Sequence, residues 1–593
     1  MLIHRSIEAC VREAVKAVLP EADVSEILLR PCPNPKFGDY QCNSLMALAK
    51  AGKMNPRQLA TDVVEKLCAD EWCEPVEIAG PGFLNFRLKT EAIAAALESA
   101  RAGEHLFFEK ADRPESIVID FSSPNVAKPM HVGHIRSTIL GESLKRIFRL
   151  LGHTVVGDNH IGDWGTQFGK LLVGWKEELN REALEAHALE EMERLYKLIN
   201  DRCESDETTL KRARAELVKL QGGDEENLAI WKEMIALSQS QFDEVYARLG
   251  VSFDESLGES FYNDRLKAVV EELKEKDIAR ESEGAMCVFS DGSLAEKDDP
   301  FLIHRDGEWN PNPAIVLKSD GGANYTTSDL ATLEHRLKTW GPDRIIYVTD
   351  GRQQHHFTQL FNIFRRWRPE ENVRLDHVWF GAILGEDGKP FKTRAGGTIR
   401  LTDLLNEAEE RGYAVAKGKY EGRDDTSAPS EDAQKEIGRV IGLGGIKYAD
   451  LSPNRQSDYK FSWERMLSLQ GNSFPYLLNA YVRIRSIFRK ANDGASTESA
   501  TALALTDPKE RALAKQMLDF DFVLQSVVEE CRPNLLCNYL YELACQFAQF
   551  YEACPVLKAE EPQRGTRLAL CDLVSRVLKQ GLEALGLETT DRM

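Results

Sequence analysis

The segment from residue 116 to residue 157 constrains the fold more than any other part of the chain. The apolar run at residues 117–119 suits a strand that is covered on both faces. A loop at residues 121–134 follows it, and apolar residues then recur on one face of a helix over residues 134–151. A second strand at residues 153–157 completes a strand–loop–helix–strand unit. This order predicts a doubly wound, Rossmann-like α/β fold that binds ligands at the carboxyl ends of its strands.

Length and residue pattern divide the chain into three domains, because 593 residues are too many for one hydrophobic core. We expect an N-terminal α+β module at residues 1–113 and a catalytic α/β domain at residues 114–455. A charged, helix-rich insertion at about residues 177–310 interrupts the catalytic domain, and an all-helical domain occupies residues 456–593. After the insertion the α/β pattern returns in three runs, at residues 314–318, 344–348 and 378–384.

The composition is that of an ordinary globular protein, with 42% hydrophobic and 29% charged residues. No apolar run approaches the length that crosses a bilayer, and residues 1–20 form an amphipathic helix instead of a signal peptide. We therefore expect a cytoplasmic protein with no membrane partner. The net charge of −20 counts against nucleic-acid binding, although a binding face needs only a locally basic surface.

Twelve cysteines are spread along the chain, and none forms a Cys-x-x-Cys pair. The nearest neighbours, Cys68 and Cys73, have no matching second pair, so neither a structural zinc site nor a disulfide framework is expected. No carboxylate or cysteine cluster accompanies the adjacent His355 and His356. We therefore expect the protein to hold no metal ion of its own.

The sharpest chemical signal lies in the loop at residues 124–134, between the predicted strand and helix. His131 and His134 stand where the helix begins, so both imidazoles can face an anion held at the helix N-terminus. Gly133 leaves room for a nucleotide, and Lys128 adds a mobile positive charge. Fixed donors suit the charge that grows on an α-phosphate under attack, at about 3–4 kcal/mol each. The alternative is two histidines that cap a helix or hold a metal.

Residues 131–134, His-Val-Gly-His, resemble the His-Ile-Gly-His motif of class I aminoacyl-tRNA synthetases. The preceding residues 121–129 resemble the arginyl members of that class, and so does Gly-Asp-Trp-Gly-Thr-Gln-Phe-Gly at residues 162–169. Gly-Asp-Tyr-Gln at residues 38–41 and Tyr-Ala-Asp-Leu-Ser at residues 448–452 extend the resemblance over nearly the whole chain. Matches of this extent and order are not expected by chance.

The resemblance implies an ATP-dependent ligase that joins L-arginine to tRNA(Arg) through an arginyl-adenylate, with Mg²⁺ carried by ATP. It also implies that adenylate formation requires bound tRNA. The implied catalytic residues are Lys128, His131, His134, Lys389 and Lys392, and the implied ATP-binding residues are Pro124, His131, Gly133, His134 and Lys392.

Residues 388–394 are the candidate for the lysine-rich loop that class I synthetases close over the triphosphate. Lys389 and Lys392 preserve the lysine spacing of the family's Lys-Met-Ser-Lys motif. A second alignment, with the arginyl form Met-Ser-Thr-Arg, places Lys392 at the serine, and the resemblance implies that Lys128 then compensates. The alternative is a solvated basic turn.

Specificity for arginine requires a carboxylate that meets the planar guanidinium edge-on. Tyr325 and Asp329 share one face if they lie on a helix, so the ring can flank the cation while the carboxylate pairs with it. This spacing is common on ordinary helix surfaces, and only the resemblance makes it a substrate motif. The resemblance adds three arginine-binding residues, Ser123, Asn125 and Gln353, the last two holding the arginine backbone.

Residues 481–490 interleave basic and apolar side chains, as on a helix that packs on one side and contacts phosphate on the other. A solvated basic face explains the pattern equally well. The resemblance makes the C-terminal domain the anticodon-binding one, with Tyr476, Arg483 and Arg485 as expected tRNA contacts. It makes the N-terminal module a contact of the tRNA elbow. We expect a monomer.

Two rival interpretations remain. A small nucleotidyltransferase would share the fold without needing a long helical tail, and a synthetase for another amino acid would lack the pair of Tyr325 and Asp329. A regulatory relative that only binds RNA would be expected to lose His131, His134 or Lys128. Charging of mixed tRNA with each common amino acid in turn separates these possibilities.

Overall fold

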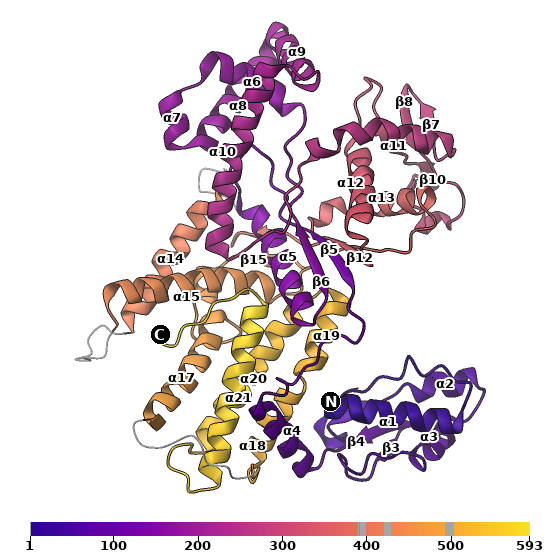
Figure 1. Ribbon diagram of the computed structural model, residues 1–593, viewed down its shortest axis with the longest axis vertical. Coiled ribbons are helices and arrows are strands. Elements are labelled where there is room, and N and C mark those ends of the chain that lie inside the picture. Colours follow the sequence, from indigo (N-terminus) through magenta and orange to yellow (C-terminus); the bar gives the residue numbers. More distant parts are fainter. Residues whose placement is uncertain (1, 390, 392–398, 420–428, 493–502) are drawn as a thin grey trace. The chain divides into compact units, whose positions relative to one another are not determined.

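The computed structural model describes residues 2–389, 391, 399–419, 429–492 and 503–593 (Figure 1). The chain forms two compact units. The sheet unit comprises Asp112–Ala414 and Ala449–Arg465. The helical unit comprises Met1–Ala111, Val415–Tyr448 and Met466–Met593. No helix of the described residues combines the length and apolar character needed to cross a membrane.

A four-stranded parallel sheet in the order β13-β12-β5-β6 forms the centre of the sheet unit. Strand β5 is buried from residue 117 onward and pairs with β12 on one side and β6 on the other. Helix α5 connects β5 to β6, so the predicted strand–loop–helix–strand unit is confirmed. These elements are β5 (Ser116–Asp120), α5 (Val132–Leu150), β6 (Thr154–Asp158), β12 (Arg344–Tyr347) and β13 (Arg374–His377).

Three helices pack with this sheet in one hydrophobic cluster. They are α11 (Asn263–Glu275), α12 (Tyr325–Trp340) and α13 (Gln354–Trp367). Their buried residues in the cluster include Leu273, Leu330, Leu333, Leu360 and Trp367. Only one turn of 3-10 helix lies between β12 and α13, so the first turn of α13 lies close to the carboxyl end of a central strand.

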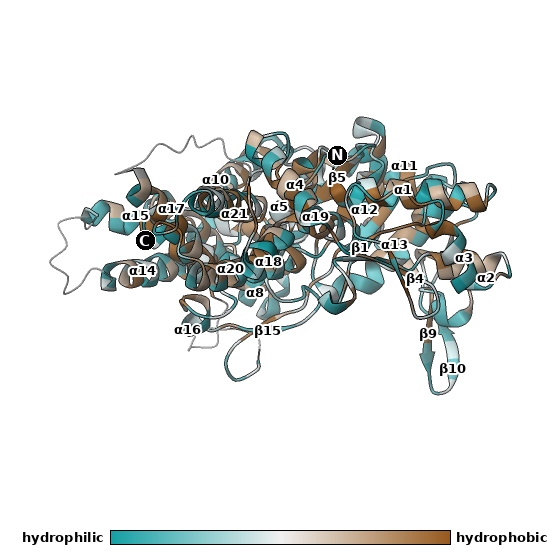
Figure 2. Ribbon diagram, turned by 90° about the horizontal axis from the view of Figure 1, so that it is seen from below, coloured by the Kyte–Doolittle hydropathy of each residue, from teal (hydrophilic) through white to brown (hydrophobic). Residues whose placement is uncertain are grey.

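The helical prediction for about residues 177–310 is correct for the first part and wrong for residues 279–310. The helical part comprises α6 (Gln167–Glu178), α7 (Arg181–Ala186), α8 (Ala188–Ser205), α9 (Glu207–Gln221), α10 (Glu225–Leu249) and α11. The rest contains β7 (Ala279–Ser282), β8 (Ala285–Val288), β9 (Leu302–Arg305) and β10 (Glu308–Pro311). Each strand is four residues long. β10 is hydrophilic (Figure 2), β9 begins with two adjacent apolar residues and β8 is apolar throughout, so apolar alternation could not reveal them.

Two other strand predictions need correction. β11 (Ala314–Leu317) lies in a separate antiparallel sheet with β8 and β7, not in the parallel sheet. Its residues alternate between buried and more exposed, which is typical of an antiparallel strand with one open face. Within residues 378–384 only β14 (Ile383–Leu384) is a strand, and it pairs with β15 (Tyr459–Lys460).

The first part of the helical unit is a small α+β module, as predicted. Its antiparallel sheet has the order β1-β2-β4-β3. The strands are β1 (Arg30–Pro31), β2 (Tyr40–Cys42), β3 (Glu77–Ala79) and β4 (Phe83–Phe86). The helices are α1 (Ile3–Val18), α2 (Leu45–Ala51), α3 (Pro56–Val64) and α4 (Thr90–Ala102).

Long helices make up the rest of the helical unit. Within residues 456–593, β15 and a short α16 (Trp463–Met466) come before the long helices. The helices are α14 (Leu401–Gly418) and α15 (Glu431–Leu451), which run across the unit boundary, and α17 (Phe474–Asn492), α18 (Pro508–Leu518), α19 (Phe520–Glu530), α20 (Asn534–Ala553) and α21 (Gln563–Ala584).

The small module is tied to these helices by an ion pair and a hydrogen bond. Asp39, in the Gly-Asp-Tyr-Gln segment, accepts from Nη2 of Arg511 on α18 at 2.8 Å. Nε2 of His4 lies 2.9 Å from Oδ2 of Asp521 on α19. The resemblance in the 38–41 segment therefore includes a residue that holds the module in place.

Candidate functional site

Two histidines close the N-terminus of α5 with a reciprocal pair of hydrogen bonds. His131 is the N-cap residue, and its Nδ1 accepts from the amide of Gly133 at 3.1 Å. Nδ1 of His134 accepts from the amide of His131 at 3.0 Å. Because each Nδ1 is an acceptor, each neutral ring carries its proton on Nε2. Both side chains therefore keep one N–H donor for a ligand.

The histidine rings lie 3.9 Å apart between their centroids and are neutral near pH 7. Burial and the neighbouring His131 lower the pKa of His134 to about 3. Burial, Arg352 and Lys128 lower the pKa of His131 from its ordinary value. Formal positive charge near the motif comes instead from Lys128, whose exposed amine lies 5.1 Å from the centre of the Tyr196 ring.

The loop before α5 is held in a strained conformation. Three residues other than glycine have left-handed backbone angles, with φ of 72° at Ser122, 48° at Ser123 and 62° at Ala127. Buried partners fix each of them. Ser122 and Ser123 donate their amides to Ser137 and Asn159, at 2.8 Å and 3.1 Å. The Ala127 amide donates to the buried Ser238 hydroxyl at 3.0 Å, so the surrounding fold determines the loop.

The 162–169 segment supports the same loop from the other side. The amide of Gly162 donates to the carbonyl of Pro124 at 3.0 Å, and the amide of Val126 donates to the carbonyl of Gly162 at 3.0 Å. A Cβ at Gly162 would lie 2.4 Å from Oδ1 of Asn125, so a larger residue would displace that side chain. The two segments that carry the family resemblance therefore form one contact.

Helix α12 carries Tyr325 and Asp329, the two residues predicted to bind the guanidinium. Tyr325 is its first residue and is 61% exposed, while Asp329 is half-buried. Oδ2 of Asp329 lies 2.6 Å from Nε2 of His356, and the rings of His356 and Tyr325 meet edge-on at 4.7 Å. Gln353 ends the turn that precedes α13, which carries His356. Sequence reasoning considered His356 only as a metal ligand and missed this contact.

A second carboxylate, Glu259, also lies near Asp329 and was missed. Burial raises the pKa of Glu259 to about 7 against the opposing charge of His160, and Asp329 and Asp163 add to the rise. Asp163 positions this turn by accepting from the amide and hydroxyl of Ser260, at 2.8 Å and 2.6 Å. The charged pattern around residue 259 looked like part of a solvated insertion, so nothing in the sequence distinguished this glutamate.

A buried ion triad lies beneath the site. Arg336 on α12 pairs with Asp120 and Asp158, which end β5 and β6, with N–O distances of 2.7 Å. Oδ1 of Asp120 also accepts from the hydroxyl of Ser123 at 3.0 Å. The triad thus links the strained loop, the strand ends and the helix that carries Asp329.

Comparison with known families matches the chain in three parts. Residues 96–463 match the family described as tRNA synthetases class I (R), catalytic domain, and residues 477–593 match the DALR anticodon binding domain. Residues 5–88 match the arginyl tRNA synthetase N terminal domain. The chain belongs to the arginyl-tRNA synthetase family.

Individual relatives cover the full length. An arginine–tRNA ligase of Synechococcus elongatus is 44% identical over 97% of this chain and 96% of its own. That of Hahella chejuensis is 43% identical over 99% of this chain and 100% of its own. The arginyl-tRNA synthetase structure of Plasmodium falciparum superposes with a TM-score of 0.79 at 28% identity, covering 100% of this chain and 99% of that one. The Thermus thermophilus structure, at 23% identity and a TM-score of 0.80, shares the fold over both full lengths.

Membership confirms the predicted activity. The enzyme ligates arginine to tRNA in translation, uses ATP and passes through an aminoacyl-adenylate. Arginine and tRNA are its substrates. Within the part of the chain that the structure describes, no group of three or more His, Cys, Asp or Glu side chains is arranged to hold a metal ion.

The second lysine loop is described only in part. Lys389 is exposed, and its amide donates to Asp387 at 3.0 Å, whereas Lys392 lies outside the described residues. The described chain resumes at residue 399 beside the histidine motif, where the amide of Val132 donates to the carbonyl of Ile399 at 3.0 Å. Ile399, the first described residue after this gap, therefore lies next to His131.

The expected tRNA contacts all lie on α17 of the helical unit. The hydroxyl of Tyr476 is 3.6 Å from Sγ of Cys545. Arg483 lies over the ring of Tyr551 at 5.8 Å. Nε of Arg485 donates to Oδ1 of Asp591 at 3.2 Å, so this arginine already has an acidic partner.

Proposed function

We propose that arginine binds with its guanidinium between Asp329 and Glu259 and with its backbone at Ser123, Asn125 and Gln353. Two carboxylates on different elements suit a cation with donors along more than one edge. Tyr325 flanks its plane. The contact of Asp329 with His356 supports this arrangement, because it fixes one carboxylate oxygen and leaves the other for the substrate.

The α-phosphate of ATP lies at the N-terminus of α5 in this proposal. A carboxylate oxygen of arginine attacks the phosphorus, the bond to the β-phosphate oxygen breaks, and pyrophosphate leaves. His131 and His134 donate from Nε2 to the phosphoryl oxygens as charge grows there, and Lys128 supplies a full positive charge. Pro124 and Gly133 border the nucleotide. A Cβ at Gly133 would lie 2.9 Å from the His131 ring, which supports a requirement for glycine.

The remaining steps involve the lysine loop and tRNA. Lys389 and Lys392 clamp the β- and γ-phosphates, and Mg²⁺ arrives with ATP. The 2′-hydroxyl of the terminal adenosine then attacks the arginyl carbonyl carbon, and AMP leaves. We propose that adenylate formation requires bound tRNA, so vigorous pyrophosphate exchange without RNA would contradict this point.

The domain roles follow the predicted boundaries. Residues 114–455 carry out catalysis, with an insertion at about 177–310. Residues 1–113 contact the tRNA elbow, and residues 456–593 bind the anticodon through Tyr476, Arg483 and Arg485. The enzyme acts as a monomer in the cytoplasm, where translation takes place.

One observation carries the substrate assignment: Asp329, the ring of Tyr325 and a second carboxylate gather at the start of α12. The test is ATP-dependent charging of mixed tRNA with each common amino acid, by the wild-type enzyme and by Asp329→Ala. We expect arginine alone to be charged, and the variant to lose at least about 10³-fold in kcat/KM while keeping its fold. Near-normal arginine activation by Asp329→Ala would refute the pocket.

A further inference from the structure

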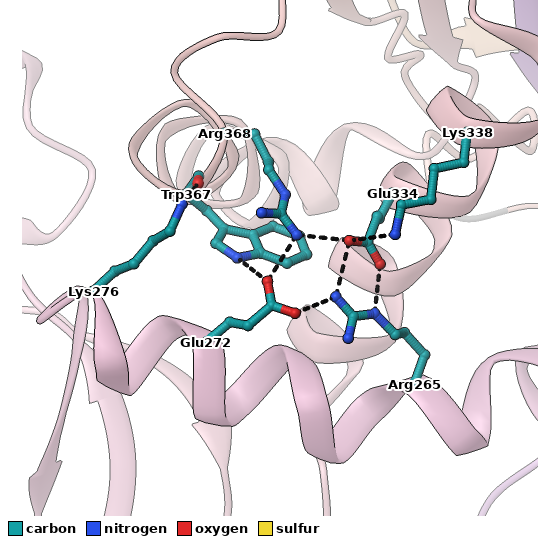
Figure 3. Close-up of polar contacts among 7 residues, drawn as sticks. All are labelled: Arg265, Glu272, Lys276, Glu334, Lys338, Trp367 and Arg368. Atoms are coloured by element: carbon teal, nitrogen blue, oxygen red, sulfur yellow. Dashed lines mark hydrogen bonds and ion pairs between the residues drawn. The ribbon is translucent and has the colours of Figure 1, made fainter.

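A cluster of charged side chains joins three helices at a distance from the reacting atoms (Figure 3). Arg265 and Glu272 come from α11, Glu334 from α12, and Arg368 from the end of α13. The side chain of Glu334 is only 6% exposed, so this carboxylate lies inside the cluster. Figure 3 shows it between the two guanidinium groups.

Glu334 accepts hydrogen bonds from both neighbouring helices. Arg265 on α11 donates from Nε at 2.5 Å and from Nη2 at 2.9 Å, which is a two-pronged contact. Arg368 donates to Oε1 at 2.7 Å, and the same nitrogen donates to Glu272 at 2.7 Å. Glu272 also accepts from Nε1 of Trp367 at 3.2 Å. The two arginines therefore bridge the two carboxylates, and these ion pairs connect helices α11, α12 and α13.

The carboxylate of Glu334 stays ionised near neutral pH. Burial opposes ionisation of Glu334, but hydrogen bonds from Arg265, Lys338 and Arg368 outweigh it and lower its pKa to about 2. A charged, nearly buried carboxylate with this many donors holds its position more rigidly than an exposed ion pair does.

Each of the three helices either carries a residue of the proposed arginine pocket or directly follows one. The turn with Glu259 leads directly into α11. Asp329 lies on α12, five residues before Glu334, and His356 lies on the first turn of α13. A shift of one helix against another would therefore change the distances among Glu259, Asp329 and His356.

We propose that Glu334 is a positioning residue for the arginine pocket. It fixes the spacing of the two carboxylates that receive the guanidinium, without contacting the substrate. The proposal rests on the proposed assignment of arginine to Asp329. Since the nucleotide subsite stands on α5 and its loop, loss of Glu334 acts on arginine and leaves ATP binding unchanged.

The network contains its own control. Lys338 donates to Glu334 at 2.9 Å, but it lies one turn away on the same helix and is 69% exposed. It contributes charge without joining two helices. Lys338→Met therefore tests the loss of a cation, whereas Glu334→Gln tests the loss of the connection between helices.

A second control measures loss of stability alone. Asp376 on β13 accepts from Nε of Arg344 on β12 at 2.6 Å, so this pair also joins two elements of the sheet unit. Its elements carry no residue assigned to the arginine pocket. Asp376→Asn is expected to lower stability while leaving both Michaelis constants unchanged.

The experiment is pyrophosphate exchange in the presence of tRNA, with the active fraction of each preparation titrated. We expect Glu334→Gln to raise the KM for arginine between about tenfold and a hundredfold, with the KM for ATP within about twofold of wild type. Arg368→Lys keeps the charge but ends one bond short of the guanidinium nitrogen that donates to both carboxylates. It is expected to show a smaller rise in the same direction. Lys338→Met and Asp376→Asn should show none.

Two results would overturn the positioning role: equal changes in both Michaelis constants of Glu334→Gln, or a KM for arginine no higher than that of Asp376→Asn. If Glu334→Gln does not fold, Arg368→Lys decides by the same criterion. Asp329→Ala is assayed alongside. Normal arginine binding by that variant would refute the pocket itself. Loss of arginine binding by that variant, together with an unaffected Glu334→Gln, would refute only the positioning role of Glu334.

Discussion

Two substitutions of His134 distinguish the roles of its two ring nitrogens. Nδ1 is two bonds beyond Cβ and accepts the His131 amide, and Nε2 is three bonds beyond and keeps the free N–H. Asparagine places an oxygen at the first position, and glutamine places an amide nitrogen near the second. His134→Asn therefore preserves the cap and loses the phosphate donor, whereas His134→Gln does the reverse.

The magnitudes follow from these roles. Loss of one transition-state donor costs about 2.7–4 kcal/mol, so His134→Asn should lower kcat of adenylate formation by about 10²–10³. Loss of the cap in His134→Gln costs about 1 kcal/mol of stability, and most of the rate should remain. Pyrophosphate exchange with tRNA measures the rate, and thermal unfolding measures the cap. A His134→Asn enzyme as fast as wild type would refute the donor role.

The sign of the pH dependence gives a separate check on the same residue. A required histidinium would lose its proton as pH rises, and the rate would fall through that pKa. Burial instead lowers the pKa of both histidines, to about 3 for His134, so they are neutral above the ordinary value of 6.5. We expect these residues to impose no loss of rate from about pH 7 to pH 8.5. A tenfold fall per pH unit that disappears in His134→Gln would contradict neutral donors.

Two further predictions concern Glu259, which no motif indicated, and Asp39 of the 38–41 segment. The pKa of Glu259 is raised to about 7, and guanidinium binding requires its ionised form, so the KM for arginine should fall about tenfold between pH 6 and pH 8. Glu259→Gln should raise that KM and abolish its pH dependence, and an unchanged pH profile would exclude the role. Asp39→Ala removes the partner of Arg511 and of the Leu88 amide. It should weaken docking of the N-terminal module by about 2 kcal/mol, measured as faster hydrogen exchange in residues 1–111, and unchanged exchange would contradict the role.

The sequence predicted those parts of the fold and site that depend on residues close together in the chain. The β5–α5–β6 unit follows from apolar periodicity, and its confirmation also fixed the place of His131 and His134. The sequence predicted two donors at the start of a helix. The structure adds that both histidines also cap this helix, because they accept hydrogen bonds from backbone amides of the same turn. Their neutrality could not be foreseen, since it depends on burial by distant segments.

What the sequence did not predict depends on long-range contact. Glu259 comes near Asp329 through a turn that Asp163 holds, and Asp163 lies almost a hundred residues earlier in the chain. His356 reaches Asp329 from a different helix. Residues 279–311 contain four-residue strands without apolar alternation, and pairing with their partners, not their own pattern, makes them strands. Single-sequence periodicity contains no signal for such pairings.

The central claim is that neutral donors at the start of α5 face the α-phosphate while Asp329 receives the guanidinium. A crystal structure of the enzyme with tRNA and a non-hydrolysable arginyl-adenylate analogue tests both parts at once. We expect the group that replaces the phosphate within hydrogen-bonding distance of Nε2 of His131 and His134. We also expect the guanidinium to pair with the carboxylate of Asp329. An analogue bound with either end away from these residues would contradict the account.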